Sequence, residues 1–227
     1  MLRGNEMLAN TFLEDIESIV SARNNHDLIN LSDWNPSNKF IQSVNAILPT
    51  SFIQNGIDYI FSSEINDEIK NKVKFKLGFG ENKSLELSFF DSGSLSIVNV
   101  IHLLSKIGIH DITIISPSYF SVEHICKDYA INCRHVELEK QGPSFILPNN
   151  YDKILKNCQC IWLTNPVYCT GTYWEENFIN NLNDLIEGTD TLLVIDESLS
   201  EIHRLISPKI SSRRCITITS PHKALCT

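Results

Sequence analysis

The sequence predicts an α/β domain of three layers (α/β/α), in which helices cover both faces of a mainly parallel sheet. Short apolar runs rich in β-branched residues alternate along the chain with amphipathic stretches, a pattern typical of strands that are buried on both faces. The composition agrees, because 227 residues with 42% hydrophobic content can bury a continuous core.

The first 50 residues are expected to form an arm that precedes a large domain over residues 51–227. Apolar residues at helical spacing predict an amphipathic helix over residues 8–22, and a polar extended segment follows over residues 29–38. Two further helices are expected around residues 51–61 and 65–77.

The large domain contains six predicted strands, each a run of apolar and β-branched residues, at 85–90, 112–115, 133–138, 160–164, 192–195 and 215–219. Amphipathic stretches between them predict helices at 94–106, 119–129, 175–186 and 198–206. The chain ends at Thr227, directly after a strand and its loop. We therefore expect the C-terminus to be a cut, with a C-terminal small domain missing.

Charge and cysteine content limit the classes of partner. A formal net charge of −8 argues against a nucleic-acid or anionic-membrane surface and favours a small molecule or a protein. Seven cysteines without CxxC pairs indicate neither a zinc site nor a disulfide framework, and no metal is predicted. Acidic residues interrupt the first 20 positions, where a signal peptide needs an apolar core, so a cytoplasmic location is expected.

Five polar loops follow predicted strands, at the strand ends where open α/β sheets bind ligands. The first is Asp91-Ser92-Gly93-Ser94-Leu95-Ser96, at the start of a helix. Backbone N–H groups and the positive end of the helix dipole at such a turn suit a phosphate. The alternative is a serine N-cap with a turn glycine and no ligand.

The next loops offer an aromatic ring, a polar turn and two acids. Tyr119 follows a Pro turn, where it either stacks on a flat ligand or belongs to the core. The loop over residues 163–172 either points polar groups into a crevice or is only a turn. Asp196 and Glu197 end a buried strand, where a charged acid needs a partner, and capping of a helix by Asp196 or Ser198 is the alternative.

The fifth loop carries Ser220 and Lys223. A lysine beside a phosphate-binding serine can form an imine with an aldehyde cofactor when its amine is partly neutral. A surface lysine is the alternative.

In their order and spacing, these five loops resemble the cofactor loops of the aminotransferase class I and II family, which are fold-type I enzymes dependent on pyridoxal 5′-phosphate (PLP). The resemblance implies a role for each loop. The phosphate is held by Gly93, Ser94, Leu95, Ser96 and Ser220; the ring is contacted by Tyr119 on its face, by Asn165 and Tyr168 near its hydroxyl and by Asp196 at its nitrogen; Lys223 forms the Schiff base and moves the substrate proton.

The segment over residues 31–36 also resembles the substrate loop of the family, which places Trp34 and Asn35 at the substrate, although Trp34 replaces a usual glycine. Two further positions depart from the family pattern. Tyr168 stands where asparagine is usual, and Leu199 stands where a tyrosine is usual. We interpret Tyr168 as taking over the contact to the ring oxygen that the missing tyrosine would make.

The resemblance implies an aminotransferase, which transfers an amino group from an amino acid to a 2-oxo acid through a Lys223 Schiff base and is a homodimer in its full-length form. The chain would be its cofactor-binding part. Two alternatives remain open: another fold-type I activity, such as a decarboxylase or lyase, and a truncated inactive remnant that binds PLP weakly or acts only as an interaction module.

Overall fold

The computed structural model describes residues 67–80, 85–141, 144–156, 158–211 and 214–220, and all of these belong to one compact unit. The predicted elements at 8–22, 29–38 and 51–61 and the proposed domain boundary near residue 50 lie outside the described residues. So do the predicted site residues Trp34, Asn35 and Lys223.

A five-stranded sheet forms the centre of this unit. Its strands are β1 (Asp111–Ser116), β2 (Asn132–Glu137), β5 (Cys160–Thr164), β6 (Leu192–Glu197) and β7 (Cys215–Thr219). Their order is β2-β1-β5-β6-β7, and every neighbouring pair is parallel. Two short strands, β3 (Glu139–Gln141) and β4 (Ser144–Ile146), form a separate antiparallel pair. The mainly parallel sheet is therefore confirmed.

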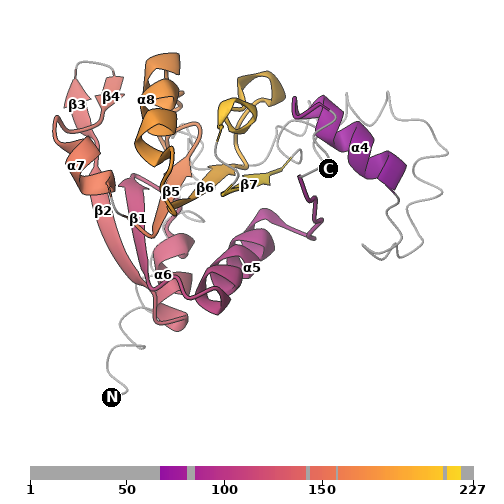
Figure 1. The fold of residues 1–227 in the computed structure, drawn as a ribbon, viewed down its shortest axis with the longest axis horizontal. Coiled ribbons are helices and arrows are strands. Elements are labelled where there is room, and N and C mark those ends of the chain that lie inside the picture. Colours follow the sequence, from indigo (N-terminus) through magenta and orange to yellow (C-terminus); the bar gives the residue numbers. More distant parts are fainter. Residues whose placement is uncertain (1–66, 81–84, 142–143, 157, 212–213, 221–227) are drawn as a thin grey trace, which may run out of the picture. The chain divides into compact units, whose positions relative to one another are not determined.

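Helices cover both faces of the sheet, which confirms the three layers (Figure 1). On one face, α5 (Gly93–Lys106) and α6 (Ser121–Asp128) pack against strand residues such as Trp162 and Val194. On the other face, α7 (Tyr151–Leu155) and α8 (Glu176–Ile186) pack against residues such as Leu163 and Ile195. The helix α4 (Asp67–Lys76) falls within the predicted helix at 65–77.

Alternation along β6 sends its two terminal acids to opposite faces. Val194 packs on the α5 side and Ile195 on the α8 side. Because successive side chains of a strand point to opposite faces, Asp196 lies on the α5 side and Glu197 on the α8 side. In β5, Thr164 follows Trp162 to the α5 side by the same alternation.

The connection order creates a switch point between β1 and β5. From β1 the chain moves outward to β2, and it then returns to the other side of β1 to form β5, β6 and β7. In open α/β sheets, ligands bind at the carboxyl ends of the strands beside such a point. The peptide bonds before Pro117 and Pro166, in the loops after β1 and β5, are both cis.

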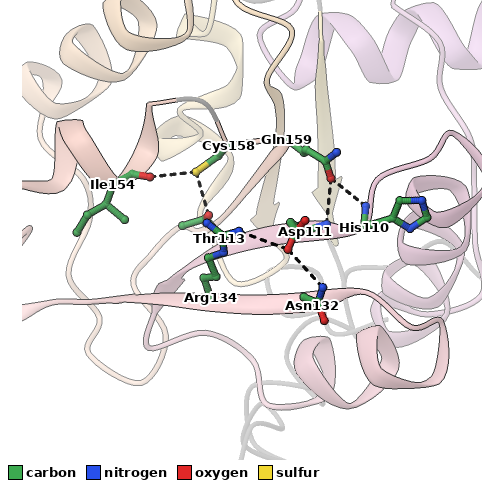
Figure 2. A network of polar contacts seen from close by, with 8 residues as sticks. All are labelled: His110, Asp111, Thr113, Asn132, Arg134, Ile154, Cys158 and Gln159. Atoms are coloured by element: carbon green, nitrogen blue, oxygen red, sulfur yellow. Dashed lines mark hydrogen bonds and ion pairs between the residues drawn. The ribbon is translucent and has the colours of Figure 1, made fainter.

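Polar contacts join the strands at the opposite, amino edge of the sheet (Figure 2). Gln159 Oε1 accepts hydrogen bonds from the backbone N–H groups of His110 and Asp111, both at 3.0 Å. The carboxylate of Asp111 lies 3.5 Å from the guanidinium of Arg134 and accepts a hydrogen bond from Asn132 Nδ2 at 3.4 Å. At this edge the polar side chains therefore bind one another or the nearby backbone.

Two predicted elements are wrong. Residues 85–90 form no strand, because no neighbouring strand in the described part of the chain pairs with them. The helix predicted at 198–206 is replaced by two short 3-10 turns, η2 (Ile202–Arg204) and η3 (Ser207–Lys209). There the carboxylate of Glu197 binds the N–H groups of Ile206 and Ser207, which favours tight turns around that acid over a continuous helix.

Candidate functional site

The predicted site residues within the described ranges gather at the carboxyl edge of the sheet and at the start of α5. Tyr119 follows β1, Asn165 and Tyr168 follow β5, Asp196 lies in β6, and Ser220 follows β7. These four strands are neighbours in the sheet, so the loops that the sequence separates by up to about 100 positions meet at one edge.

Asp196 is a buried acid with few partners. Its side chain is 5% exposed, and within the described residues Ser198 is its only hydrogen-bonding partner, with the Ser198 N–H donating to Oδ1 at 3.0 Å. Burial raises the pKa of Asp196 above its ordinary value, and the hydrogen bonding by Ser198 offsets this rise only in part. This contact spans two residues within a turn, and no helix follows for Asp196 to cap, so the capping alternative is not observed and the carboxylate is not satisfied.

Glu197 is equally buried but well satisfied. Its Oε1 accepts hydrogen bonds from Asn165 Nδ2 at 2.8 Å and from the Ile206 N–H at 2.7 Å. Its Oε2 accepts from the N–H of Ser207 at 3.4 Å and from the hydroxyl of the same residue. Burial raises the pKa of Glu197, opposed by these donors. Glu197 therefore ties the loop after β5 to the turn η3.

Asn165 contributes to this hydrogen-bond network through its amide nitrogen. Besides Glu197, its Nδ2 donates to the backbone oxygen of Arg204 at 3.1 Å and to Ser200 Oγ at 3.5 Å. Its Oδ1 is buried and accepts no hydrogen bond from the described residues. A ligand would therefore meet Asn165 as an acceptor.

Two buried hydroxyl groups near Asp196 were not singled out from the sequence. Thr164 pairs with Asp196 in register between β5 and β6, and its Oγ1 has no hydrogen-bond partner in the described structure. Ser198 Oγ is also buried without a geometrically formed hydrogen bond, and it lies 3.6 Å from the position that a Cβ on Gly93 would occupy. The Thr164 hydroxyl could have been found from the sequence, because the alternation of side chains along β5 places Thr164 on the same face as Trp162. The position of the Ser198 hydroxyl depends on a tertiary contact with the start of α5.

The start of α5 lies beside this group. Ser92 is the N-cap, and its Oγ accepts a hydrogen bond from the Leu95 N–H at 3.1 Å, so the capping geometry is present. The Ser96 hydroxyl donates to the backbone oxygen of Gly93 at 2.7 Å. The N–H groups of Gly93 and Ser94 meet no acceptor in the ranges described, and they are the donors that remain for an anion.

Two tyrosines lie together over the switch point. The rings of Tyr119 and Tyr168 contact edge to face, with centroids 5.8 Å apart, and Tyr119 also packs against the core beneath α5. Burial raises the pKa of Tyr168, so its phenol stays protonated and remains a hydrogen-bond donor. Tyr168 thus lies half-buried against Tyr119 and not out in solvent.

Other kinds of site find no support in the described part. Its His, Cys, Asp and Glu side chains include no group of three or more arranged to hold a metal ion. Of the helices that were described, none is long and apolar enough to cross a membrane.

A parallel three-layer domain, in which the described residues leave a buried acid with a single partner and N–H groups without acceptors beside the switch point, has the architecture of the cofactor-binding domain of fold-type I PLP enzymes. The sequence matches the model of the family "Aminotransferase class I and II" over residues 36–203. The chain belongs to this family, whose members depend on PLP. Among curated proteins, none matches the sequence.

Solved structures share the fold at low sequence identity. Cystalysin from Treponema denticola, which contains a pyridoxal 5′-phosphate cofactor, matches with a TM-score of 0.65 and 14% identity over 92% of this chain and 56% of its own. YbdL from Escherichia coli, which has a methionine aminotransferase function, matches with a TM-score of 0.69 and 16% identity over 91% of this chain and 56% of its own. Aspartate aminotransferase of Plasmodium falciparum matches with a TM-score of 0.69 and 13% identity over 93% and 58%. The chain thus spans a little more than half the length of these proteins.

Proposed function

We propose that this chain is the PLP-binding part of an aminotransferase, which transfers an amino group from an amino acid to a 2-oxo acid and works as a homodimer in full-length form. The observation that carries the proposal is the buried carboxylate of Asp196, which has Ser198 as its only described partner and lies beside Thr164, whose hydroxyl has no partner among the described residues. Membership of the family supports the choice of cofactor.

The chemistry of PLP fits the groups that are present. Its phosphate needs N–H donors, which Gly93 and Ser94 retain at the start of α5. Its protonated ring nitrogen needs a buried acid, and Asp196 is one that has no cation beside it among the described residues. Its flat ring suits the face of Tyr119. Its aldehyde needs an amine, which we assign to Lys223 three residues beyond Ser220.

When bound, the cofactor withdraws electrons from the substrate Cα, so that a bond to this carbon can break. Asp196 would keep the proton on the ring nitrogen and become ionised in doing so, since a positive partner removes the penalty that burial imposes. Lys223 Nζ would move the proton between the substrate Cα and the C4′ atom of the cofactor. Glu197, through Asn165, would hold the loop that carries Tyr168 in place. Tyr168 would donate its phenolic proton to the ring oxygen.

Titration of the purified chain with PLP tests the cofactor assignment. We expect a visible absorbance band, and borohydride should then fix a pyridoxyl label on Lys223, identified by peptide mapping. Lys223→Ala should abolish the label, whereas Lys209→Ala, at an exposed lysine, should leave it unchanged. A folded chain that takes up no PLP, or a label that persists in Lys223→Ala, would contradict the assignment.

The products of the reaction distinguish the activities. An amino acid mixed with the loaded full-length enzyme should yield its oxo acid and the amine form of the cofactor. Release of ammonia and a thiol from a sulfur amino acid would instead indicate a lyase, and release of carbon dioxide a decarboxylase. A loaded protein that gives none of these products would indicate an inactive remnant.

A further inference from the structure

A second cluster of reactive side chains lies between α6 and the edge of the sheet. Ser116 ends β1, His135 lies in β2, and Glu123 lies in α6. Ser116 Oγ is 2.7 Å from His135 Nδ1, and His135 Nε2 is 3.5 Å from Glu123 Oε2. Three elements thus place a hydroxyl, an imidazole and a carboxylate in one row.

The carboxylate in this row is anchored on its other side. Lys127 Nζ, one turn along α6, lies 2.8 Å from Glu123 Oε1. The hydrogen bond from Lys127 is the main reason that the pKa of Glu123 lies below its ordinary value, so the carboxylate is ionised at neutral pH. An anion facing Nε2 favours the tautomer that carries the proton on this nitrogen.

The tautomer decides what His135 can do. With a proton on Nε2, Nδ1 is an acceptor, and the Ser116 hydroxyl donates to it. A serine hydroxyl bound to a neutral imidazole, which is held in turn by a carboxylate, is the arrangement that activates serine as a nucleophile on several unrelated folds.

We propose that Ser116, His135 and Glu123 form a hydrolytic site for small activated carboxylic esters, with Ser116 as nucleophile, His135 as general base and Glu123 as the positioning residue. This site does not depend on the cofactor or on Lys223.

The reaction balances without a further reagent. Ser116 Oγ bonds to the ester carbonyl carbon while its proton passes to His135 Nδ1. The bond from that carbon to the leaving oxygen then breaks, and the leaving oxygen takes the proton from Nδ1. A water molecule repeats the sequence on the acyl-serine, which releases the carboxylic acid and restores the Ser116 hydroxyl.

Access and donors for the oxyanion are both present. The side chain of His135 is 36% exposed and Ser116 is partly exposed, so a small ester can reach them. In the turn that follows Ser116, the N–H groups of Ser118 and Phe120 donate to no acceptor within the described residues. They remain available for the charge that develops on the carbonyl oxygen.

Hydrolysis of p-nitrophenyl acetate by the cofactor-free full chain tests the proposal. We expect Ser116→Ala and His135→Gln each to lower the rate about a hundredfold, at the modest end of general acid–base effects. Ser88→Ala and His124→Gln are controls, since they remove an exposed serine and an exposed histidine of α6 that have no part in the proposed site, and both should keep the rate. Equal rates in Ser116→Ala and the unmodified chain would overturn the proposal.

Two further measurements separate this chemistry from background. A fluorophosphonate probe should label Ser116 in the unmodified chain and in Lys223→Ala, and labelling elsewhere or not at all would contradict the assignment. For the positioning role, Glu123→Gln should lower the rate about tenfold, and Glu123→Asp should restore most of it because the charge is kept. If Glu123→Gln hydrolyses the ester as fast as Glu123→Asp, Glu123 has no positioning role.

Discussion

The amino and carboxyl edges of the sheet satisfy their polar groups in different ways. At the amino edge, Gln159, Asp111 and Arg134 bind one another or nearby backbone, and the contacts close over the ends of β1, β2 and β5 (Figure 2). At the carboxyl edge, Thr164 Oγ1 and Ser198 Oγ are buried without partners in the described structure. Because unpaired buried polar groups are costly, the difference marks the carboxyl edge as the place where a ligand completes the structure.

The two acids at the end of β6 show the same contrast over one peptide bond. Glu197 is surrounded by donors from Asn165, Ile206 and Ser207, whereas Asp196 has Ser198 alone among the described residues. Alternation of the strand explains the split, because it turns Glu197 toward the turns near α8 and Asp196 toward α5. The carboxylate of Glu197 thus stabilises the fold on one face of the sheet, and in our proposal the carboxylate of Asp196 binds the cofactor on the other.

The largest effect on stability is expected from Glu197→Gln. The carboxylate of Glu197 accepts hydrogen bonds from several buried donors. The amide group of glutamine would turn its own N–H donors toward some of them, so at least one buried hydrogen bond to a charged group is lost. We expect a loss of about 3 kcal/mol in the free energy of unfolding, measured by urea denaturation. Glu187→Gln, at an exposed glutamate just beyond α8, is the matched control and should change little. A Glu197→Gln protein as stable as that control would show that the network carries no such energy.

Asp196→Asn should act on the ligand and not on the fold. Loss of a charge-assisted hydrogen bond should weaken PLP binding by about 1.5–3 kcal/mol, or roughly 10- to 150-fold, measured by fluorescence titration. Asp190→Asn, at a fully exposed aspartate, should keep the affinity. Unchanged affinity in Asp196→Asn would place the ring nitrogen elsewhere.

The same variant has a signature in the cofactor-free protein. Burial raises the pKa of Asp196 above its ordinary value of 3.8, so the folded chain keeps a proton that the unfolded chain releases. Its contribution to stability is complete below the unfolded value and is lost as the pH rises through the folded pKa. Asp196→Asn should therefore reduce the loss of stability with rising pH, and an identical pH profile would contradict a raised pKa.

Strands that are buried on both faces were predictable, since runs such as 160–163 and 192–195 are apolar throughout and are followed by polar residues. Short elements were not, because α7 and the pair β3 and β4 contain too few residues to establish a period. The order of the loops predicted that the candidate residues would gather at the carboxyl edge. The hydrogen bond from Asn165 to Glu197 and the burial of the Ser198 hydroxyl could not be predicted, because both arise from tertiary contacts that no local sequence pattern encodes.

A substitution at the amino edge should lower stability without changing PLP affinity, which is the reverse of the effect expected for Asp196→Asn. Gln159→Ala removes the acceptor for two backbone N–H groups, so we expect a loss of about 1–2 kcal/mol in stability at this partly solvated place. Its PLP affinity should match that of the unmodified chain. Gln141→Ala, at an exposed glutamine of β3, serves as the control for stability. A weaker PLP affinity in Gln159→Ala would mean that the amino edge also affects ligand binding at the carboxyl edge, which would contradict their separate roles.

The smallest expected effect belongs to Tyr168, which stands at the site where the family usually has asparagine. Its ring touches that of Tyr119, and burial raises the pKa of its phenol, so it can donate a hydrogen bond to the ring oxygen of the cofactor while Leu199 offers none. Tyr168→Phe keeps the ring contact and removes only the donor, so PLP affinity should fall by about 1 kcal/mol, or roughly fivefold. The visible absorbance of the bound cofactor should also titrate at higher pH, because the phenol no longer stabilises the oxyanion. Tyr129→Phe, whose ring contacts His102 and lies away from the site, should leave both measurements unchanged. If Tyr168→Phe shifts neither the affinity nor the titration, Tyr168 does not replace the tyrosine that Leu199 displaced.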